Sequence, residues 1–285
     1  MRGGACLFVL GTVNACTGLA GLDDLQFAAA SGSGGVGQAG NTTSTSSTAS
    51  QGGAASTAAT GGAATGYASE VLADQPLAYW RFGEAPGATV AIDASGNGRD
   101  GNYVGAVQLG ADGAVPGDSD TAAYFDASSN VVVGDFFDFI GVQPFSLEAW
   151  IKQDASQLGY QGICSKIHTG LGEGYVLYTT NPLHPKFTIY SSDMGADVAY
   201  GAAVSGAEYT HLVATFDGST ARLFVNGIES MSLAAVGPTT DVDIPFVIGN
   251  NHEGNEFLGA IDEVAVYGTA LAPARVQAHY AAAIR

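Results

Sequence analysis

The sequence predicts an all-β fold, a sandwich of two antiparallel sheets with one short helix near its C-terminal end. Apolar and polar side chains alternate along residues 145–152, and residues 260–267 are rich in β-branched and aromatic residues with apolar side chains on both alternating faces. Both patterns indicate a β-strand. Other segments rich in β-branched and aromatic residues follow at the short intervals that are typical of a sandwich. The chain has 285 residues, which is enough for one sizeable domain of this kind with appendages.

The individual elements are expected in chain order. Strands are expected at residues 77–82, 122–125, 131–133, 145–152, 163–166, 174–179, 186–190, 211–217, 221–226, 246–248 and 260–267. Asn226-Gly227 predicts a two-residue hairpin, because a type I′ turn needs positive φ at both central residues. The Gly-rich segment 91–105 is expected to be an irregular turn. Pro273–Ala283 is the one convincing helical stretch, and Pro273 suits the first helical position.

The last expected strand carries an unusual carboxylate. Strict alternation places Asp262 on one face with Val264 and Val266, and places Glu263 on the opposite face. An ionised carboxylate on an apolar face is costly unless it is paired, hydrogen-bonded or bound to a metal. Asp262 therefore needs a partner elsewhere in the fold.

The N-terminal residues predict export. A short apolar stretch ends in Val13-Asn14-Ala15-Cys16, which resembles a bacterial lipoprotein signal in which Cys16 is acylated and becomes the new N-terminus. The alternative is an ordinary secretory signal that is cut after Ala15. Both interpretations export the protein, either to the cell envelope or outer surface with a lipid anchor or as a secreted protein.

Composition separates a tether from a globular domain. In the segment 28–66, 35 of 39 residues are Ala, Gly, Ser or Thr, and none is charged. Such a segment buries too little apolar surface to offset the entropy of ordering it. We therefore expect a signal at 1–15, a flexible tether at 16–66 and one folded domain at 67–285.

Charge and cysteine content exclude several classes of partner. The chain has 27 acidic and 9 basic residues, a formal net charge of −18. It has no basic stripe that could displace counterions from nucleic acid or bind an anionic membrane surface. A lipid anchor is thus the only membrane attachment that we expect. Three cysteines are too few for a disulfide framework.

Several short motifs occur together in a fixed order. They are Tyr79-Trp80-Arg81, Asp93-Ala94-Ser95-Gly96-Asn97-Gly98, and the segments 145–152, 211–218, 223–227 and 259–263. As a set they resemble the LamG-like jelly-roll domains of the concanavalin A-like lectin/glucanase superfamily, over about residues 71–283. The resemblance implies a two-sheet jelly-roll sandwich. It also implies an accessory module on a secreted or surface protein, which binds glycans or proteins and in many members carries Ca²⁺.

The first candidate site is a structural calcium site. The resemblance implies that the two ends of the domain meet, so Asp93 and Asn97 can lie near Asp262. Ca²⁺ takes six to eight oxygen ligands and commonly combines carboxylates with carbonyls. The alternative is a metal-free arrangement in which Asp262 accepts hydrogen bonds from backbone N–H groups.

The second candidate site is a sugar-binding surface. Trp150 and Tyr178 could stack on a sugar ring, and Asn251, His252 and Asn255 belong to a polar loop that could hydrogen-bond hydroxyl groups. The alternative is that the aromatic residues pack inside the fold and that the loop only turns the chain.

We predict no catalytic residues. Glucanases with this fold place two carboxylates at alternate positions of one strand, whereas Glu148 has no carboxylate two positions away. The sequence therefore favours a non-catalytic surface protein that recognises glycans or neighbouring proteins. The alternatives are a structural or assembly module without a soluble ligand and a divergent glycoside hydrolase. Neither the bound partner nor the oligomeric state follows from the sequence.

Overall fold

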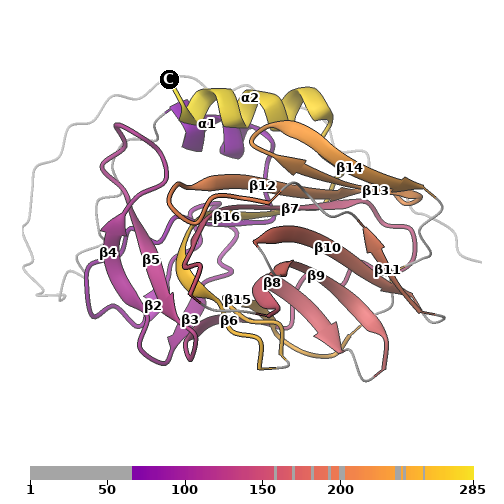
Figure 1. Cartoon of the computed structure of the whole chain (residues 1–285), viewed down its shortest axis with the longest axis horizontal. Helices are drawn as coiled ribbons and strands as arrows, with labels where there is room; N and C mark the ends of the chain where they lie inside the picture. Colours follow the sequence, from indigo (N-terminus) through magenta and orange to yellow (C-terminus); the bar gives the residue numbers. More distant parts are fainter. Residues whose placement is uncertain are drawn as a thin grey trace, which may run out of the picture. The chain divides into compact units, whose positions relative to one another are not determined.

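Two antiparallel sheets lie face to face, and two helices cover the outer face of one of them (Figure 1). The structure is a computed structural model that describes residues 66–285, apart from 157–158, 169–170, 181–182, 192–193, 199–202, 235–238, 240–241 and 253. The predicted signal, Cys16 and the rest of the tether up to residue 65 lie outside the described residues. The predicted jelly-roll sandwich is confirmed.

Sheet A has eight strands and lies beneath the helices. Seven of its strands follow the order β14-β13-β12-β7-β16-β5-β4, and β1 pairs with β16 beside β5. The bounds are β1 Ala78–Trp80, β4 Gln108–Asp112, β5 Thr121–Asp126, β7 Phe145–Gln153, β12 Thr210–Phe216, β13 Thr220–Val225, β14 Ile228–Ala234 and β16 Leu258–Tyr267.

Sheet B also has eight strands, in the order β11-β10-β9-β8-β15-β6-β3-β2. The bounds are β2 Val90–Ala91, β3 Gly101–Val104, β6 Asn130–Gly134, β8 Gln161–His168, β9 Glu173–Thr180, β10 His184–Ser191, β11 Met194–Val198 and β15 Phe246–Ile248. The expectation that 91–105 is irregular throughout is wrong, because β3 forms there. Gly101 makes this pairing possible, since a Cβ atom at that position would lie 2.3 Å from Cγ1 of Val131 on β6.

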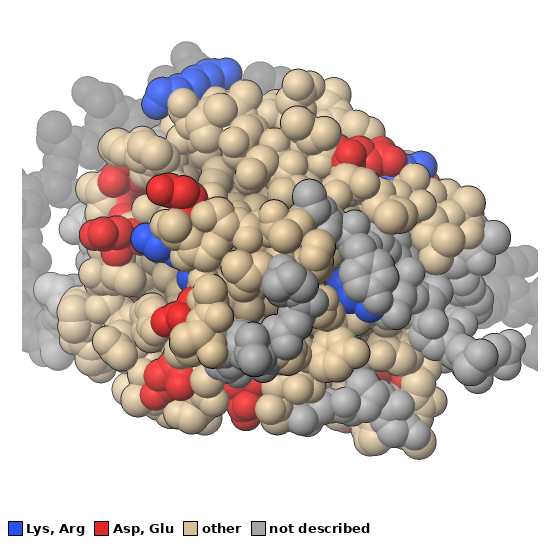
Figure 2. Space-filling model, viewed as in Figure 1, with Lys and Arg blue, Asp and Glu red and all other residues tan. Residues whose placement is uncertain are grey.

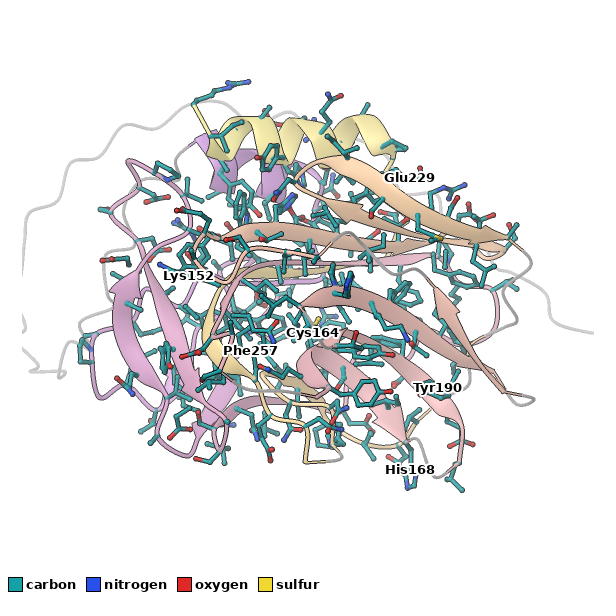
Figure 3. The ribbon with its side chains drawn as sticks, viewed as in Figure 1. Lys152, Cys164, His168, Tyr190, Glu229 and Phe257 are labelled. Carbon is teal, nitrogen blue, oxygen red and sulfur yellow. The ribbon has the colours of Figure 1, made fainter. Side chains whose placement is uncertain are left out.

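The main core fills the space between the sheets. Inward-facing side chains of both sheets form one cluster, and the fully buried Trp80 stacks on Phe246 with ring centroids 6.1 Å apart. Cys164 lies in this core as a free thiol, as expected, and burial raises the pKa of that thiol (Figure 3).

A β-bulge in β16 changes the faces that simple alternation predicts. The pairing of β16 with β7 shifts between Asp262 and Ala265, and Glu263 has a φ of 51°. Beyond the bulge Val264 and Val266 face the main core, together with Ile261 before it. The prediction that Asp262 shares a face with these valines, opposite Glu263, is therefore wrong. The extra residue of a bulge reverses the alternation that follows it.

The helix layer consists of α1 (Gly66–Ala73) and α2 (Pro273–Ala283). The predicted α2 is confirmed, with Pro at its first turn and no side-chain cap from Ala272. Helix α1 was not expected. It is short, and its stability comes from burying Tyr67, Ala68 and Val71 against sheet A and α2 rather than from intrinsic propensity. Neither described helix is long and apolar enough to cross a membrane.

The described residues on the face shown in Figure 2 are predominantly neutral and acidic. On the face shown in Figure 2, acidic side chains are scattered over the described residues and basic side chains lie apart from one another. One of the few basic side chains does not contribute to the surface, because Lys166 is buried and forms ion pairs with Asp135 and Asp138.

Candidate functional site

The outer face of sheet A can be described as rows of cross-strand neighbours. Ala260 on β16 pairs with Tyr124 on β5 and with Lys152 on β7. The next outward-facing position of β16 is Asp262, which pairs with Trp150. Directly paired residues place their side chains on the same face of a sheet, so the methyl group of Ala260 lies between two long side chains. A small residue in that position leaves a hollow.

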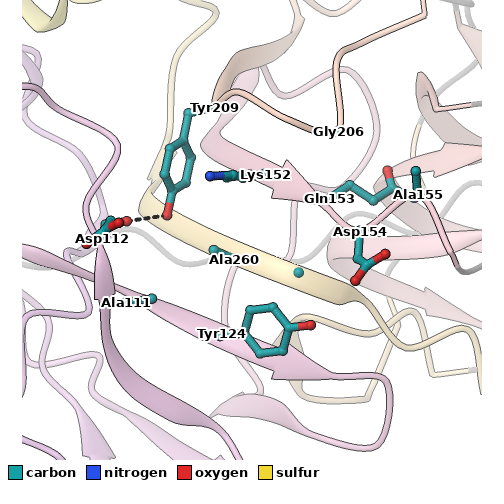
Figure 4. A pocket seen from close by; sticks show the side chains of 11 residues that line it. Ala111, Asp112, Tyr124, Lys152, Gln153, Asp154, Ala155, Gly206, Tyr209 and Ala260 are labelled. Carbon is teal, nitrogen blue, oxygen red and sulfur yellow. Dashed lines mark hydrogen bonds between the residues drawn. The ribbon is translucent and has the colours of Figure 1, made fainter.

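The hollow is a pocket of about 450 Å³ (Figure 4). Its floor is formed by small residues and its walls by two tyrosines, one on β5 and one just before β12. The lining residues are Ala111, Asp112, Tyr124, Lys152, Gln153, Asp154, Ala155, Gly206, Tyr209, Gly259 and Ala260. Polar groups at the rim and aromatic walls around a small-residue floor are features of ligand pockets.

A hydrogen bond closes the end of the pocket nearest the helices. The hydroxyl group of Tyr209 donates to the backbone oxygen of Asp112 at 2.5 Å. Tyr209 also packs against the cluster beneath the helices, and its burial raises its pKa. The Lys152 ammonium group lies 5.9 Å from the centroid of the Tyr209 ring. These contacts hold the Tyr209 wall in place without a bound ligand.

Asp154 supplies an ionised carboxylate at the rim. Its Oδ1 accepts a hydrogen bond of 2.8 Å from the backbone N–H of Ser156. Hydrogen bonds from Ser156 lower the pKa of Asp154, because they favour the charged form. The pocket therefore presents a fixed hydrogen-bond acceptor at neutral pH.

Asp262 lies in the next row and is 1% exposed. Its Oδ2 accepts a hydrogen bond from Ala114 N–H at 2.7 Å, and its Oδ1 accepts one from Glu263 N–H at 2.9 Å. Burial, followed by the nearby charge of Glu263, raises its pKa well above the usual range. Its immediate partners are thus backbone donors, which is the arrangement that the metal-free alternative describes.

Glu263 lies beside Asp262 on the helix side of the sheet and forms an ion-pair cluster with Arg81. The Arg81 guanidinium lies 3.0 Å from Glu263, 2.7 Å from Asp118 and 3.0 Å from Asp120. The hydroxyl group of Tyr79 also donates to Glu263. Burial raises the pKa of Glu263 to about 7 although Arg81 lowers it. One cation thus stabilises three carboxylates.

Glu148 is fully buried and is the centre of a second polar cluster. Tyr67 and Tyr267 donate hydroxyl hydrogen bonds to it at 3.0 and 2.6 Å, and His211 Nε2 lies 2.7 Å from its Oε1. His279 Nδ1 lies 3.0 Å from Oε2. Burial alone would raise the pKa of Glu148, but the two histidines hold it below the usual range.

The same cluster fastens both helices to the sheet. His279 on α2 contacts Glu148 through Nδ1 and Asp74, just after α1, through Nε2 at 2.8 Å. An imidazole whose two nitrogens both face carboxylates is stabilised as the doubly protonated cation. Burial opposes that charge, yet Glu148 and Asp74 raise the pKa of His279. Arg275 adds an ion pair to Asp74 at 2.9 Å.

The predicted calcium ligands have contacts of their own. Asp93 accepts hydrogen bonds from the backbone N–H groups of Tyr79, Ser95 and Arg99 at 2.9–3.0 Å. The amide group of Asn97 donates to backbone oxygens at 3.0 Å. Among the described residues, no hydrogen bond or ion pair joins this turn to Asp262, and no group of three His, Cys, Asp or Glu side chains has the arrangement of a metal site. Calcium binding stays a prediction.

Trp150 does not belong to an exposed sugar platform. It is 3% exposed and packs beneath α2, where its ring stacks on Tyr280 at 5.9 Å and lies 4.9 Å from His211. The helix layer covers the ring of Trp150, so the expectation that Trp150 could stack on a sugar is wrong.

Two of the other predicted sugar-binding residues, Tyr178 and Asn255, lie next to Gly162 of sheet B. Gly162 pairs with Tyr178, and its N–H donates to the backbone oxygen of Asn255 at 2.9 Å. Gly162 is required there because a Cβ atom would lie 2.4 Å from the Asn250 carbonyl carbon. Tyr178 is only 7% exposed, with Lys186 over its ring.

The polar loop itself is mostly engaged with the protein. Asn251 is 7% exposed, and its N–H donates to the side chain of Asn250. His252 is exposed, with its Nε2 2.8 Å from Pro245 O. The loop leads directly into Gly259 and Ala260, which line the pocket.

The pocket residues Tyr124, Lys152, Asp154 and Tyr209 were not predicted. Alternation along β7 indicates that Lys152 faces outward, which is the one usable sequence signal. That Lys152 shares a row with Ala260 and Tyr124 depends on the register of three strands that are far apart in the chain.

Comparison with known proteins agrees with this architecture. The sequence profile of the concanavalin A-like lectin/glucanases superfamily matches residues 119–277, more than half of the chain. No curated protein matches the sequence. Among solved structures, domain 4 of an extracellular arabinanase from Geobacillus stearothermophilus, in complex with arabinotriose, is 21% identical with a TM-score of 0.55. The alignment covers 72% of this chain and 98% of that domain.

Two toxin domains share the fold. The binding domain of Paraclostridial Mosquitocidal Protein 1 is 16% identical, with a TM-score of 0.57 and coverage of 73% of this chain and 52% of that one. The botulinum neurotoxin serotype D ligand-binding domain, in complex with N-acetylneuraminic acid, is 14% identical, with a TM-score of 0.57 and coverage of 76% and 52%. The chain thus spans about half the length of these two domains. The chain belongs to the concanavalin A-like lectin/glucanase superfamily.

Proposed function

We propose that this chain is an exported, lipid-anchored surface protein whose sandwich binds glycans without catalysis, at the pocket between Tyr124 and Tyr209. The observation that carries the proposal is the pocket itself: two aromatic walls, a small-residue floor and charged groups at the rim. The complexes of similar domains with arabinotriose and N-acetylneuraminic acid support a carbohydrate ligand for this fold.

The chemistry of the pocket suits a sugar. The C–H-rich face of a sugar ring packs on an aromatic ring, and its hydroxyl groups need both donors and acceptors in fixed positions. Tyr124 and Tyr209 supply aromatic faces, Lys152 supplies a donor, and Asp154 supplies an ionised acceptor. Polar groups in fixed positions orient the ligand in small-molecule sites.

The buried carboxylates and Asp154 favour binding over hydrolysis. Glycosidases need a carboxylic acid whose raised pKa keeps it protonated next to the scissile bond. Glu148, Asp262 and Glu263 are at most 1% exposed and do not line the pocket. The pKa of Asp154 in the pocket is lowered, which is opposite to what a general acid needs.

Export and anchoring are proposed on the sequence of the first 66 residues. The Val-Asn-Ala-Cys run that ends at Cys16 supports acylation, and the segment that follows supports a flexible tether. The acidic composition supports a partner other than nucleic acid or an anionic membrane.

The test blocks the pocket without removing its polar groups. Ala260→Leu places a larger side chain on the floor, and Ala274→Leu makes the same change on the exposed surface of α2. We expect wild-type protein and Ala274→Leu to bind the same glycans on an array, and Ala260→Leu to lose them while keeping its melting temperature within a few degrees. Equal binding by both variants would contradict the pocket as the site.

An assembly role is the second candidate, and strand β14 favours it. All seven residues of β14 are exposed at the end of sheet A, including Ile228, Met231 and Leu233. An exposed apolar edge strand can pair with another chain. This alternative would be favoured if the protein self-associates in a concentration-dependent way, if Met231→Lys abolishes that association, and if the protein binds no glycan on the array.

A further inference from the structure

We propose that the pocket recognises the end of a neutral glycan chain and discriminates against sugars that carry a carboxylate. This inference rests on the proposed function and adds the class of ligand. Two features carry it: the charges at the rim of the pocket and the hydrogen bond that closes one of its ends.

The charge of the pocket disfavours anionic ligands. Asp112 and Asp154 contribute two carboxylates, whereas Lys152 contributes the one cation among the lining residues. Lys152 lies over the Tyr209 ring, so part of its charge is already engaged. The whole chain carries a net charge of −18. A ligand carboxylate would therefore meet net repulsion both in the pocket and on approach.

Neutral hydroxyl groups match the same rim. A carboxylate accepts hydrogen bonds from two neighbouring hydroxyl groups, and an ammonium group donates to ring or hydroxyl oxygens. A carboxylate has about four lone-pair sites, and Asp154 uses one of them, on Oδ1, to accept from Ser156 N–H. Asp154 and Lys152 thus provide the acceptor and donor for adjacent hydroxyl groups of one sugar unit.

The closed end of the pocket selects a chain terminus. The Tyr209–Asp112 hydrogen bond spans the pocket on the side of the helix layer, and Tyr209 packs against the cluster beneath the helices. Figure 4 shows Tyr209 and Asp112 joined across β16, with Tyr124 and Asp154 on the other side of the pocket. A polysaccharide cannot run past this wall, so a ligand enters with one end.

The experiment compares chemically matched ligands on full-length protein. An array of neutral oligosaccharides that carry a primary hydroxyl group, among them arabinotriose, maltotriose and lactose, is screened beside sialylated and uronic acid oligosaccharides. The strongest neutral ligand is then compared by calorimetry with the same compound after oxidation of its terminal primary hydroxyl group to a carboxylate. We expect the oxidised form to bind at least ten-fold more weakly at low salt.

Salt and charge variants test the cause of this difference. The ratio of the dissociation constants of the oxidised and the neutral ligand should decrease between about 0.01 M and about 1 M NaCl, because the Debye length falls from about 30 Å to about 3 Å. Asp154→Asn keeps the acceptor for Ser156 and removes one charge, so it should reduce the discrimination about three-fold. Glu173→Gln removes one charge on β9, outside the pocket, and should leave the discrimination unchanged.

Chain ends are tested by competition. At equal mass, a short neutral oligosaccharide should compete far better than the corresponding long polymer, because it offers more ends. Equal competition would show that internal units bind and would overturn the closed-end argument.

The outcomes separate this inference from the proposed function. If anionic glycans bind best and Ala260→Leu abolishes their binding, the pocket is a glycan site and the neutral class is wrong. If no glycan binds, the proposed function and this inference both fail. Preference for neutral chains that is lost in Ala260→Leu supports both.

Discussion

The imidazole of His279, on the last helix, lies 3.0 Å from the carboxylate of Glu148, 131 residues earlier in the chain. Both side chains are fully buried. The pair joins α2 to the central strand β7, and the second ring nitrogen of His279 extends the connection to Asp74 after α1. A histidine that is charged in the folded state makes the attachment of the helix layer dependent on pH.

His279→Gln should lower the free energy of unfolding by about 3–5 kcal/mol at pH 6, because it removes a cation that lies between two carboxylates, one of them fully buried. The pKa of His279 is raised on folding. Its contribution is therefore fully present below the unfolded-state pKa of about 6.5 and is lost as pH rises through the folded-state pKa. Urea titrations from pH 5.5 to 9 should show the difference between the two proteins shrinking at the alkaline end.

The control for this prediction is His168→Gln. His168 lies at the exposed end of β8 (Figure 3), so this variant should match wild type at every pH. A difference between wild type and His279→Gln that stays constant across the range would show that the charge of His279 is not what holds the helices.

Arg81→Met should destabilise the protein strongly at neutral pH. Arg81 is the shared cation of Asp118, Asp120 and Glu263, and breaking a buried pair typically costs about 3–5 kcal/mol. The pKa values of Asp120 and Glu263 are already raised by burial, so these groups take up protons readily as pH falls. The loss measured at pH 7 should therefore decrease toward pH 4.5.

Arg222→Met is the matched control for Arg81. Arg222 pairs with Asp217 at 2.7 Å where both side chains are about one third exposed, and such surface pairs contribute at most about 1 kcal/mol. Similar losses for the two variants would mean that the Arg81 cluster is no more stabilising than a surface ion pair.

Calcium should raise the melting temperature if Asp93, Asn97 and Asp262 hold an ion. A ligand that binds only the folded state adds about 2.7 kcal/mol at one hundred times its dissociation constant. Asp93→Asn and Asp262→Asn should each weaken this dependence, and the double variant should be less than additive. The dependence of the melting temperature on Ca²⁺ is measured by thermal unfolding in EDTA and in millimolar Ca²⁺. Equal midpoints for the wild-type protein under the two conditions would reject the site.

Acylation of Cys16 predicts incorporation of labelled palmitate into the wild-type protein and none into Cys16→Ala. The prediction rests on the Val-Asn-Ala-Cys run. Label in both proteins would place the modification elsewhere, and label in neither, with protein found in the medium, would support the ordinary secretory signal.

Most of the fold could be predicted because its strands carry local signals. The alternation in β7 and the Asn226-Gly227 hairpin are properties of neighbouring residues, and both central residues of that hairpin have positive φ, 51° and 76°. Helix α1 could not be predicted in this way. Its residues form a helix because Tyr67 reaches Glu148, which lies 81 positions away in the chain.

The site was harder to predict for two physical reasons. The pocket exists because three strands place Tyr124, Ala260 and Lys152 in one row. The register between strands that are far apart in the chain cannot be predicted from the residues of any one strand. The bulge at Glu263 then reverses the alternation of side chains along β16. A prediction that continues the alternation seen before the bulge therefore places Val264 on the outer face, whereas Val264 faces the main core.

The first and last helices that the structure describes, α1 and α2, lie side by side. Gly66 opens α1 beside the end of α2, where a Cβ atom at Gly66 would lie 3.8 Å from the carbonyl oxygen of Ala282. The start of α1 and the end of α2 are therefore close together. The pairing of the strands does not require that α1 comes first in the chain. A short linker from residue 285 to residue 66, with new ends opened at the exposed turn around Ser128, would rotate the order of the chain and keep every strand pairing in both sheets.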